Sequence, residues 1–188
     1  DSAGELYIGE GAGMRGRKGI AASGAICTVA GTGSAGYDGD GVPATSASLN
    51  YPEGLAVNTA GDLFIADTGN FRVRRVSATT GLISTVAGTG MMGFNGDAIP
   101  ATAASLSRPE GIAVSLTGEL WIADNRGQVR KIETATGLIR TVAGTTSYHI
   151  EGDDTATRVS IWPSGVTVDG SGTVYIAEDQ YHRIWRLA

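Results

Sequence analysis

The chain has 188 residues, of which 29 are glycine and 41% are hydrophobic, and its net charge is −5 at pH 7. It is long enough to bury a core, and it holds no apolar run that could cross a membrane. Its acidic pI, near 5.0, disfavours a non-specific grip on nucleic acid or anionic lipid and favours basic partners or cations. The single cysteine, Cys27, excludes an internal disulfide framework.

One phrase recurs four times: glycine, a polar residue, leucine or valine, an aromatic residue and isoleucine. Its copies occupy residues 4–8, 61–65, 118–122 and 172–176. They are 57, 57 and 54 residues apart, a period that marks a repeat architecture. The structure of one unit therefore predicts most of the chain.

Each unit begins with a predicted strand that follows a Pro-x-Gly corner. The middle residue of its apolar run is small, as expected where strands crowd near an axis. We expect these runs to be the innermost strands: Leu55–Val57, Ile112–Val114 and Val166–Val168. The recurring phrase is the second strand, and its adjacent apolar residues suit a strand covered on both faces.

The third and fourth strands of each unit lie farther from the axis. The third alternates apolar and basic residues, which predicts a half-exposed strand whose charges mark the outer edge of the sheet. The third strands are 72–76, 129–132 and 184–187. The fourth strands are 26–30, 82–87 and 139–143.

Four short strands that repeat with Gly-rich turns predict an all-β fold, a β-propeller of four-stranded antiparallel blades. Each sheet can bury its two faces only against neighbouring sheets. A parallel β-helix is the structural alternative, but its rungs are too short to carry four strands.

The phrases Pro-x-Gly-[Ile/Leu]-Ala-Val and Gly-[Asp/Glu]-Leu-aromatic-Ile-Ala-Asp, followed by a basic strand, resemble the NHL repeat family of β-propellers. The resemblance covers nearly the whole chain and about 3.3 repeats. Its most specific part is the linker Gly36–Thr45, which is similar to the long-linker form common in secreted and cell-surface proteins. The resemblance implies a disc that usually closes six blades.

We expect a single propeller domain over residues 1–188, as part of a larger disc. Both ends of the chain offer second and third strands, so they duplicate rather than complete each other. The uncovered faces of the end blades predict self-association or further blades of the same polypeptide. The predicted parts are partial blade 1–33, linker 34–53, blade 54–90, linker 91–110, blade 111–146, linker 147–164 and partial blade 165–188.

The turns after the second strands and the long linkers share one face of the predicted disc, and that face collects acids. We expect any ligand to bind there. The candidate residues are Asp38, Asp40, Asp67, Asp97, Asp124, Asp153 and Glu178. The structural alternative is that these carboxylates accept backbone amide protons in turns or pair with arginines of the third strands.

Metal sites and catalytic residues are not expected. Asp38-Gly39-Asp40-Gly41 resembles a calcium loop, but the further oxygen ligands and distal glutamate are missing. Ca²⁺ therefore stays a secondary possibility and no other cofactor is predicted. The two histidines, His149 and His182, have no second ligand at zinc spacing. No nucleophile–base arrangement follows from spacing.

The predicted function is a non-enzymatic binding or scaffolding module for a protein or glycan partner. The resemblance implies an extracellular, cell-surface or filament-associated protein. Two alternatives remain: an NHL-type lyase or hydrolase whose catalytic residues lie in other blades, and an RNA-binding NHL domain. The acidic face disfavours the RNA binder, and neither nucleic acid nor membrane insertion is expected.

Overall fold

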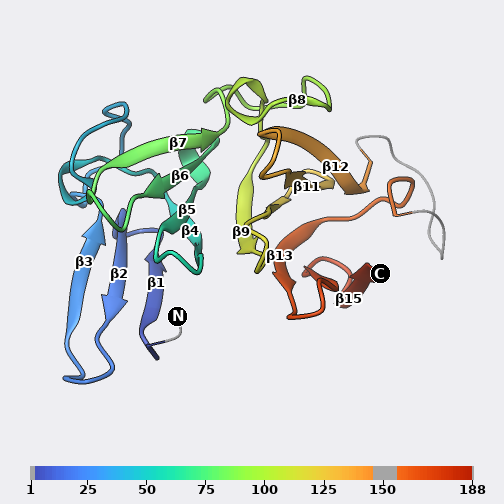
Figure 1. The fold of residues 1–188 in the computed structure, drawn as a ribbon. Helices are drawn as coiled ribbons and strands as arrows, with labels where there is room; N and C mark the ends of the chain where they lie inside the picture. Colours follow the sequence, from blue (N-terminus) through green and yellow to red (C-terminus); the bar gives the residue numbers. More distant parts are fainter. Residues whose placement is uncertain (1–2, 146–155, 188) are drawn as a thin grey trace.

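A computed structural model describes residues 3–145 and 156–187, and within these ranges the protein is all-β. Four antiparallel sheets follow one another along an open arc (Figure 1). The first sheet holds β1 (Leu6–Glu10), β2 (Arg15–Gly19) and β3 (Ile26–Ala30). The second holds β4 (Pro52–Val57), β5 (Leu63–Asp67), β6 (Arg72–Val76) and β7 (Ile83–Ala87). The third holds β9 (Pro109–Val114), β10 (Leu120–Asp124), β11 (Gln128–Ile132), β12 (Leu138–Gly144) and the short β8 (Ile99–Pro100). The fourth holds β13 (Pro163–Val168), β14 (Val174–Glu178) and β15 (Arg183–Leu187).

The predicted innermost strands are confirmed. β4, β9 and β13 begin their sheets, and β9 contacts both β4 and β13 across the blade seams. Glycine permits this approach. A methyl group added at Gly54 would collide with the carbonyl oxygen of Glu110, and one added at Gly111 would lie 2.7 Å from Cα of Gly165. The Pro-x-Gly corner is thus required where backbones nearly touch.

The core lies in the seams between sheets, as expected for blades that cover each other's faces. Three apolar clusters fill the three seams, and the linkers contribute to each of them. Ala44 and Leu49 come from the first linker, and Ala101 and Leu106 come from the second. In each of these two linkers, the segment that packs into the core begins with a single 3-10 turn, η1 (Ala44–Ser46) or η3 (Ala101–Ala103). Each linker is therefore a part of the core as well as a connection.

The outer edge of the blades differs from the prediction. The first two linkers run along the fourth strand of the following blade: β8 pairs with β12, and Pro43 forms a bridge with Leu82, next to β7. The fourth strand is the outer strand, and the linker's backbone groups, rather than basic side chains, satisfy its edge. The expectation that the basic residues of the third strand mark an exposed edge is wrong for Arg74 of β6 and Arg130 of β11, which have no exposed surface, whereas 42% of the Arg75 side chain is exposed.

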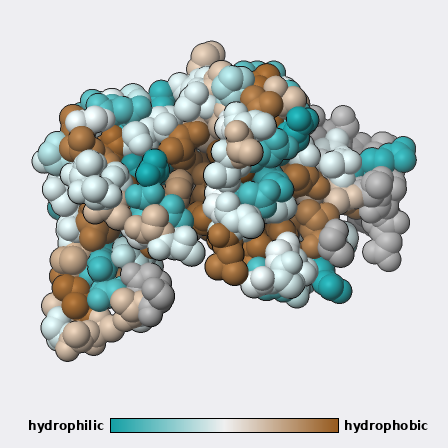
Figure 2. Space-filling model, in the orientation of Figure 1, coloured by the Kyte–Doolittle hydropathy of each residue, from teal (hydrophilic) through white to brown (hydrophobic). Residues whose placement is uncertain are grey.

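The two ends of the arc expose apolar side chains. In the first sheet, Leu6 is 63% exposed and Ile26 is 50% exposed, and in the last sheet Ile184 is 71% exposed. Figure 2 shows this brown, apolar surface on the arm formed by β1–β3 at the lower left. None of the helical turns within the described residues has the length and apolar character of a membrane span.

Candidate functional site

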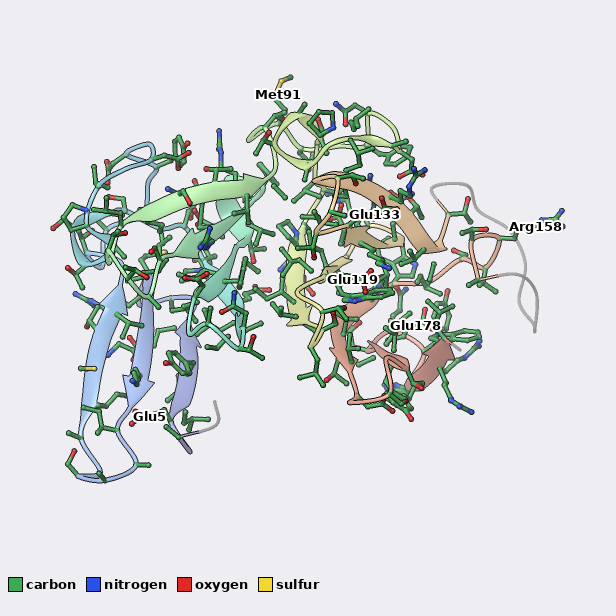
Figure 3. All side chains as sticks on the ribbon, viewed as in Figure 1. Glu5, Met91, Glu119, Glu133, Arg158 and Glu178 are labelled. Atoms are coloured by element: carbon green, nitrogen blue, oxygen red, sulfur yellow. The ribbon has the colours of Figure 1, made fainter. Side chains whose placement is uncertain are left out.

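The carboxylates at the ends of the second strands lie inside the protein. Asp67, Asp124 and Glu178 are at most 2% exposed, and each accepts a backbone N–H from the linker residue that leads into the first strand of its own blade. The oxygen–nitrogen distances are 2.7 Å for Asp67 and Asn50, 2.9 Å for Asp124 and Ser107, and 3.0 Å for Glu178 and Trp162. These side chains fasten the returning linkers. Figure 3 shows Glu178 within the last sheet.

Burial raises the pKa of Asp67 and that of Asp124 above the ordinary aspartate value, and the hydrogen bonds that they accept oppose this rise. The folded protein thus holds a proton on either carboxyl more tightly than the unfolded chain does. Ionisation of these two groups at neutral pH therefore costs stability, which their donors offset in part.

Arg74 connects the interior of the second blade to its linker. Its guanidinium lies 3.4 Å from the carboxylate of Asp67 and 3.1 Å from that of Asp40, and it donates to the carbonyl oxygen of Gly39 at 2.7 Å. The ring of Tyr37 covers it, with 4.7 Å between the guanidinium carbon and the ring centre. The linker is thus held on the blade by one buried arginine.

Arg130 repeats this arrangement in the third blade. It contacts the carboxylate of Asp97 at 3.0 Å, the carbonyl oxygen of Gly96 at 2.9 Å, and the ring of Phe94 at 4.8 Å. Burial lowers the pKa of this guanidinium, although Asp97 and Asp124 oppose the change. Two consecutive units therefore attach their linkers in the same way, each with its own buried arginine, an aspartate and an aromatic ring.

The remaining predicted residues lie nearer the solvent. Asp40 and Asp97 expose 44% and 40% of their side chains. Asp38 is exposed, and its carboxylate accepts the amide N–H of Ser48 at 2.6 Å. Hydrogen bonds from the side chain and then the backbone of Ser48 lower the pKa of Asp38. Asn95 accepts the equivalent bond in the second linker. Asp153 and His149 lie outside the described residues.

The structural alternative for the acids is confirmed at these positions, since they accept amide protons or pair with arginines. That a ligand meets this face stays a prediction, and its exposed candidates are Asp38, Asp40 and Asp97. Within residues 3–145 and 156–187, no three His, Cys, Asp or Glu side chains gather as a group that could hold a metal ion.

The linker face also holds a pocket that the sequence did not predict. A cavity of about 290 Å³ opens at the seam between the second and third blades. Its lining comes from three places: the start of β4, the turn η2 (Thr68–Asn70) with the residue after it, and the approach to β9. The lining residues are Tyr51, Glu53, Thr68, Gly69, Phe71 and Arg108.

Two of the pocket residues have left-handed backbone conformations, with φ of 48° at Tyr51 and 53° at Phe71. The position of Phe71 recurs in every unit, occupied by Met14, Gly127 and His182, and φ is positive at all of them. These four residues share no side-chain chemistry, so the sequence carries no signal that could have located the pocket wall. Three of them are not glycine, so a left-handed residue before the third strand is a general feature of the unit.

The comparison with protein families identifies the repeat. Residues 49–76 match the family model described as NHL repeat. This match confirms the resemblance predicted from the Pro-x-Gly corner and the strand that follows it.

Two curated relatives share part of the sequence. Protein SUPPRESSOR OF QUENCHING 1, chloroplastic, of Arabidopsis thaliana is 33% identical over 101 residues, which cover 53% of this chain and 9% of that protein. Teneurin-m of Drosophila melanogaster is 29% identical over 162 residues, which cover 79% of this chain and 6% of that protein. The chain thus spans less than a tenth of either relative.

Solved structures share the fold. A Bacteroides thetaiotaomicron protein of unknown function superposes with a TM-score of 0.76 and 20% identity, over 97% of this chain and 44% of that one. A chain of the nidogen/laminin complex gives 0.67 and 16%, over 98% and 56%. A streptogramin B lyase gives 0.57 and 15%, over 100% and 52%. At these identities the likeness establishes the β-propeller architecture of the four sheets.

Proposed function

We propose, from the NHL-repeat β-propeller architecture of this chain, that it is a non-enzymatic binding and scaffolding module whose linker face meets a protein partner. The observation that carries this proposal is the difference between the two faces. The linker face has long loops, exposed carboxylates and a pocket of about 290 Å³. The opposite face has short turns such as residues 58–61 and 77–81, and a smaller pocket of about 150 Å³ between the turns at 115–119 and 168–172. Binding specificity in a repeat scaffold resides in such loops.

The chemistry of the exposed groups favours a basic partner. The chain is acidic as a whole, and Asp38, Asp40 and Asp97 place negative charge at the rim of the linker face. A protein neighbour titled as a nidogen/laminin complex supports the choice of a protein partner. A glycan bridged by a cation is the other outcome of the test. The lyase-titled neighbour supports an enzyme as the second class.

Location is part of the same proposal. The long linkers support an extracellular or cell-surface protein, whereas one of the relatives is named as chloroplastic. The location of a tagged form of the full-length natural protein, outside cells or within them, would decide between an extracellular and a chloroplast protein.

The binding proposal predicts the effect of neutralising the rim. A tagged chain is used to isolate a partner, and binding is then measured for the variant Asp38→Asn/Asp40→Asn/Asp97→Asn. Affinity should fall by roughly tenfold, because three exposed charges are lost, and wild-type affinity should fall as salt rises. At residue 38 asparagine keeps the amide contact, as Asn95 already does in the second linker. At residues 40 and 97 it removes the charge that pairs with Arg74 and Arg130, so a thermal melt verifies that the variant is folded.

The control alters the opposite face, with Thr79→Lys and Leu116→Lys. Both positions lie in exposed turns. Loss of binding in this control with no change in the rim variant would overturn the proposal. Loss in neither would place the partner on the outer edge of the blades.

Self-association through the end blades is a further proposal, supported by the exposed Leu6, Ile26 and Ile184. The mass measured by light scattering should rise with concentration, and Leu6→Lys with Ile184→Lys should abolish that rise because charge opposes burial of the faces. A constant monomer mass in the unmodified chain would contradict this proposal.

A further inference from the structure

We propose that the pocket between the second and third blades receives one cationic side chain, arginine or lysine, of the protein partner. This inference rests on the proposed function, since it names the group that the partner would present. It assigns the pocket a role separate from the rim carboxylates, because Asp38, Asp40 and Asp97 do not line it.

Aromatic rings supply the first part of the argument. Tyr51 is 53% exposed and Phe71 is half-buried, and both line the cavity. The face of an aromatic ring attracts ammonium and guanidinium groups, and this attraction grows as the cation loses water. An apolar wall also covers the methylene stem of a long basic side chain.

The local charge supplies the second part. Arg108 donates to Glu110 at 2.7 Å and also pairs with Glu53 at the longer distance of 3.8 Å, so one arginine is shared between two carboxylates. Glu53 and Arg108 line the pocket and Glu110 lies beside it, which leaves one net negative charge on the three groups. Burial, and then repulsion from Glu110, raise the pKa of Glu53 above the usual glutamate value, although Arg108 opposes this rise. A second cation beside Glu53 would offset the repulsion that the shared arginine leaves.

The backbone supplies the third part. Phe71 occupies a left-handed position at which the third unit has Gly127, and glycine adopts this conformation without steric cost. Met14 and His182 hold the same conformation in the first and fourth units, so the turn accepts side chains other than glycine. Of these three side chains, Phe71 is the one that lines this pocket.

The size of the cavity limits the ligand. Its volume of about 290 Å³ lies at the lower end of pockets that enclose small organic molecules. The Thr68 hydroxyl donates to the carbonyl oxygen of Pro109 at 2.6 Å and ties the pocket wall to the next blade. A single side chain fits a preformed site of this size better than a folded surface does.

The test titrates capped Gly-Arg-Gly and Gly-Lys-Gly tripeptides into the folded chain and follows backbone amide resonances by NMR. Shifts should be confined to residues around 51–53, 68–71 and 108. The tripeptide with norleucine, which keeps the stem without the charge, and the one with aspartate should bind at least about fivefold more weakly.

Three variants test whether each group strengthens or weakens tripeptide binding. Phe71→Gly and Glu53→Gln should each weaken tripeptide binding by about fivefold, because they remove the ring and the charge. Arg108→Gln should strengthen it, since the repelling guanidinium is lost. His182→Gly is the matched control, because it makes the same change of a left-handed residue to glycine outside the pocket. Thermal melts verify that each variant is folded.

Weaker binding on Arg108→Gln together with stronger binding on Glu53→Gln would show an anion site and overturn the inference. So would absence of tripeptide shifts in the folded wild type. If the partner binds the linker face but Phe71→Gly leaves its affinity unchanged, the pocket inference fails and the proposed function stands. If the tripeptides bind as expected but the partner loses affinity only for the opposite-face variants Thr79→Lys and Leu116→Lys, the proposed function fails instead.

Discussion

Replacing Arg74 with alanine is expected to lower the free energy of unfolding by about 3–5 kcal/mol. The side chains of Arg74 and Asp67 have no exposed surface, so the variant would leave a buried carboxylate without its guanidinium. It would also release the linker at Gly39 and Asp40, which the same guanidinium contacts. Chemical denaturation monitored by fluorescence and circular dichroism measures the change.

The neighbouring Arg75 is the matched control. Its guanidinium pairs with Asp62 at 2.7 Å, but 42% of its side chain is exposed, so the water around it weakens the attraction. Arg75→Ala should cost less than about 1 kcal/mol. Equal losses for the two variants would show that burial of Arg74 does not set the energetics of this blade.

Replacing Trp121 with alanine is expected to cost about 3–5 kcal/mol, because a large ring is removed from a close-packed seam. Trp121 is 7% exposed and belongs to the apolar cluster between the third and fourth blades. Lys131 lies 5.1 Å from its ring centre, so the variant also loses a cation–π contact. The measurement is the midpoint of thermal unfolding.

Two further variants interpret that result. Trp121→Phe should cost far less than the alanine variant, because Phe64 occupies the equivalent position in the preceding unit. Leu116→Ala, at a 73% exposed turn, should change stability by less than about 0.5 kcal/mol. A melt of Trp121→Ala that matches the wild type would mean that the ring does not support the seam.

The repeat predicted the blades well because its signals are local. The Pro-x-Gly corner marks backbone crowding, and the run Leu63–Asp67 is apolar enough for a strand covered on both faces, which β5 is. Both features are read from a few adjacent residues. The alternation of the third strand was misread, because a basic residue predicts exposure only if no other segment covers it, and the linker from residue 37 onward covers Arg74.

The candidate site was predicted in part for a similar reason. The sequence correctly suggested that acids at strand ends could serve turns and arginines, and Asp67 and Asp124 do so. It could not separate these buried residues from the exposed Asp40 and Asp97. Their spacing after a strand or within a linker is the same whether solvent or another backbone segment lies beside them.

The sequence by itself determined the four-unit period, the strand order within a blade and the glycines at the inner strands, since each depends on short-range pattern and backbone sterics. Only the tertiary structure decided that the linkers pair with β7 and β12, that Arg74 and Arg130 are enclosed, and that a pocket forms. The walls of that pocket come from residues 51, 71 and 108, which are far apart in the chain. Their meeting depends on how one blade packs against the next, and no local pattern encodes that geometry.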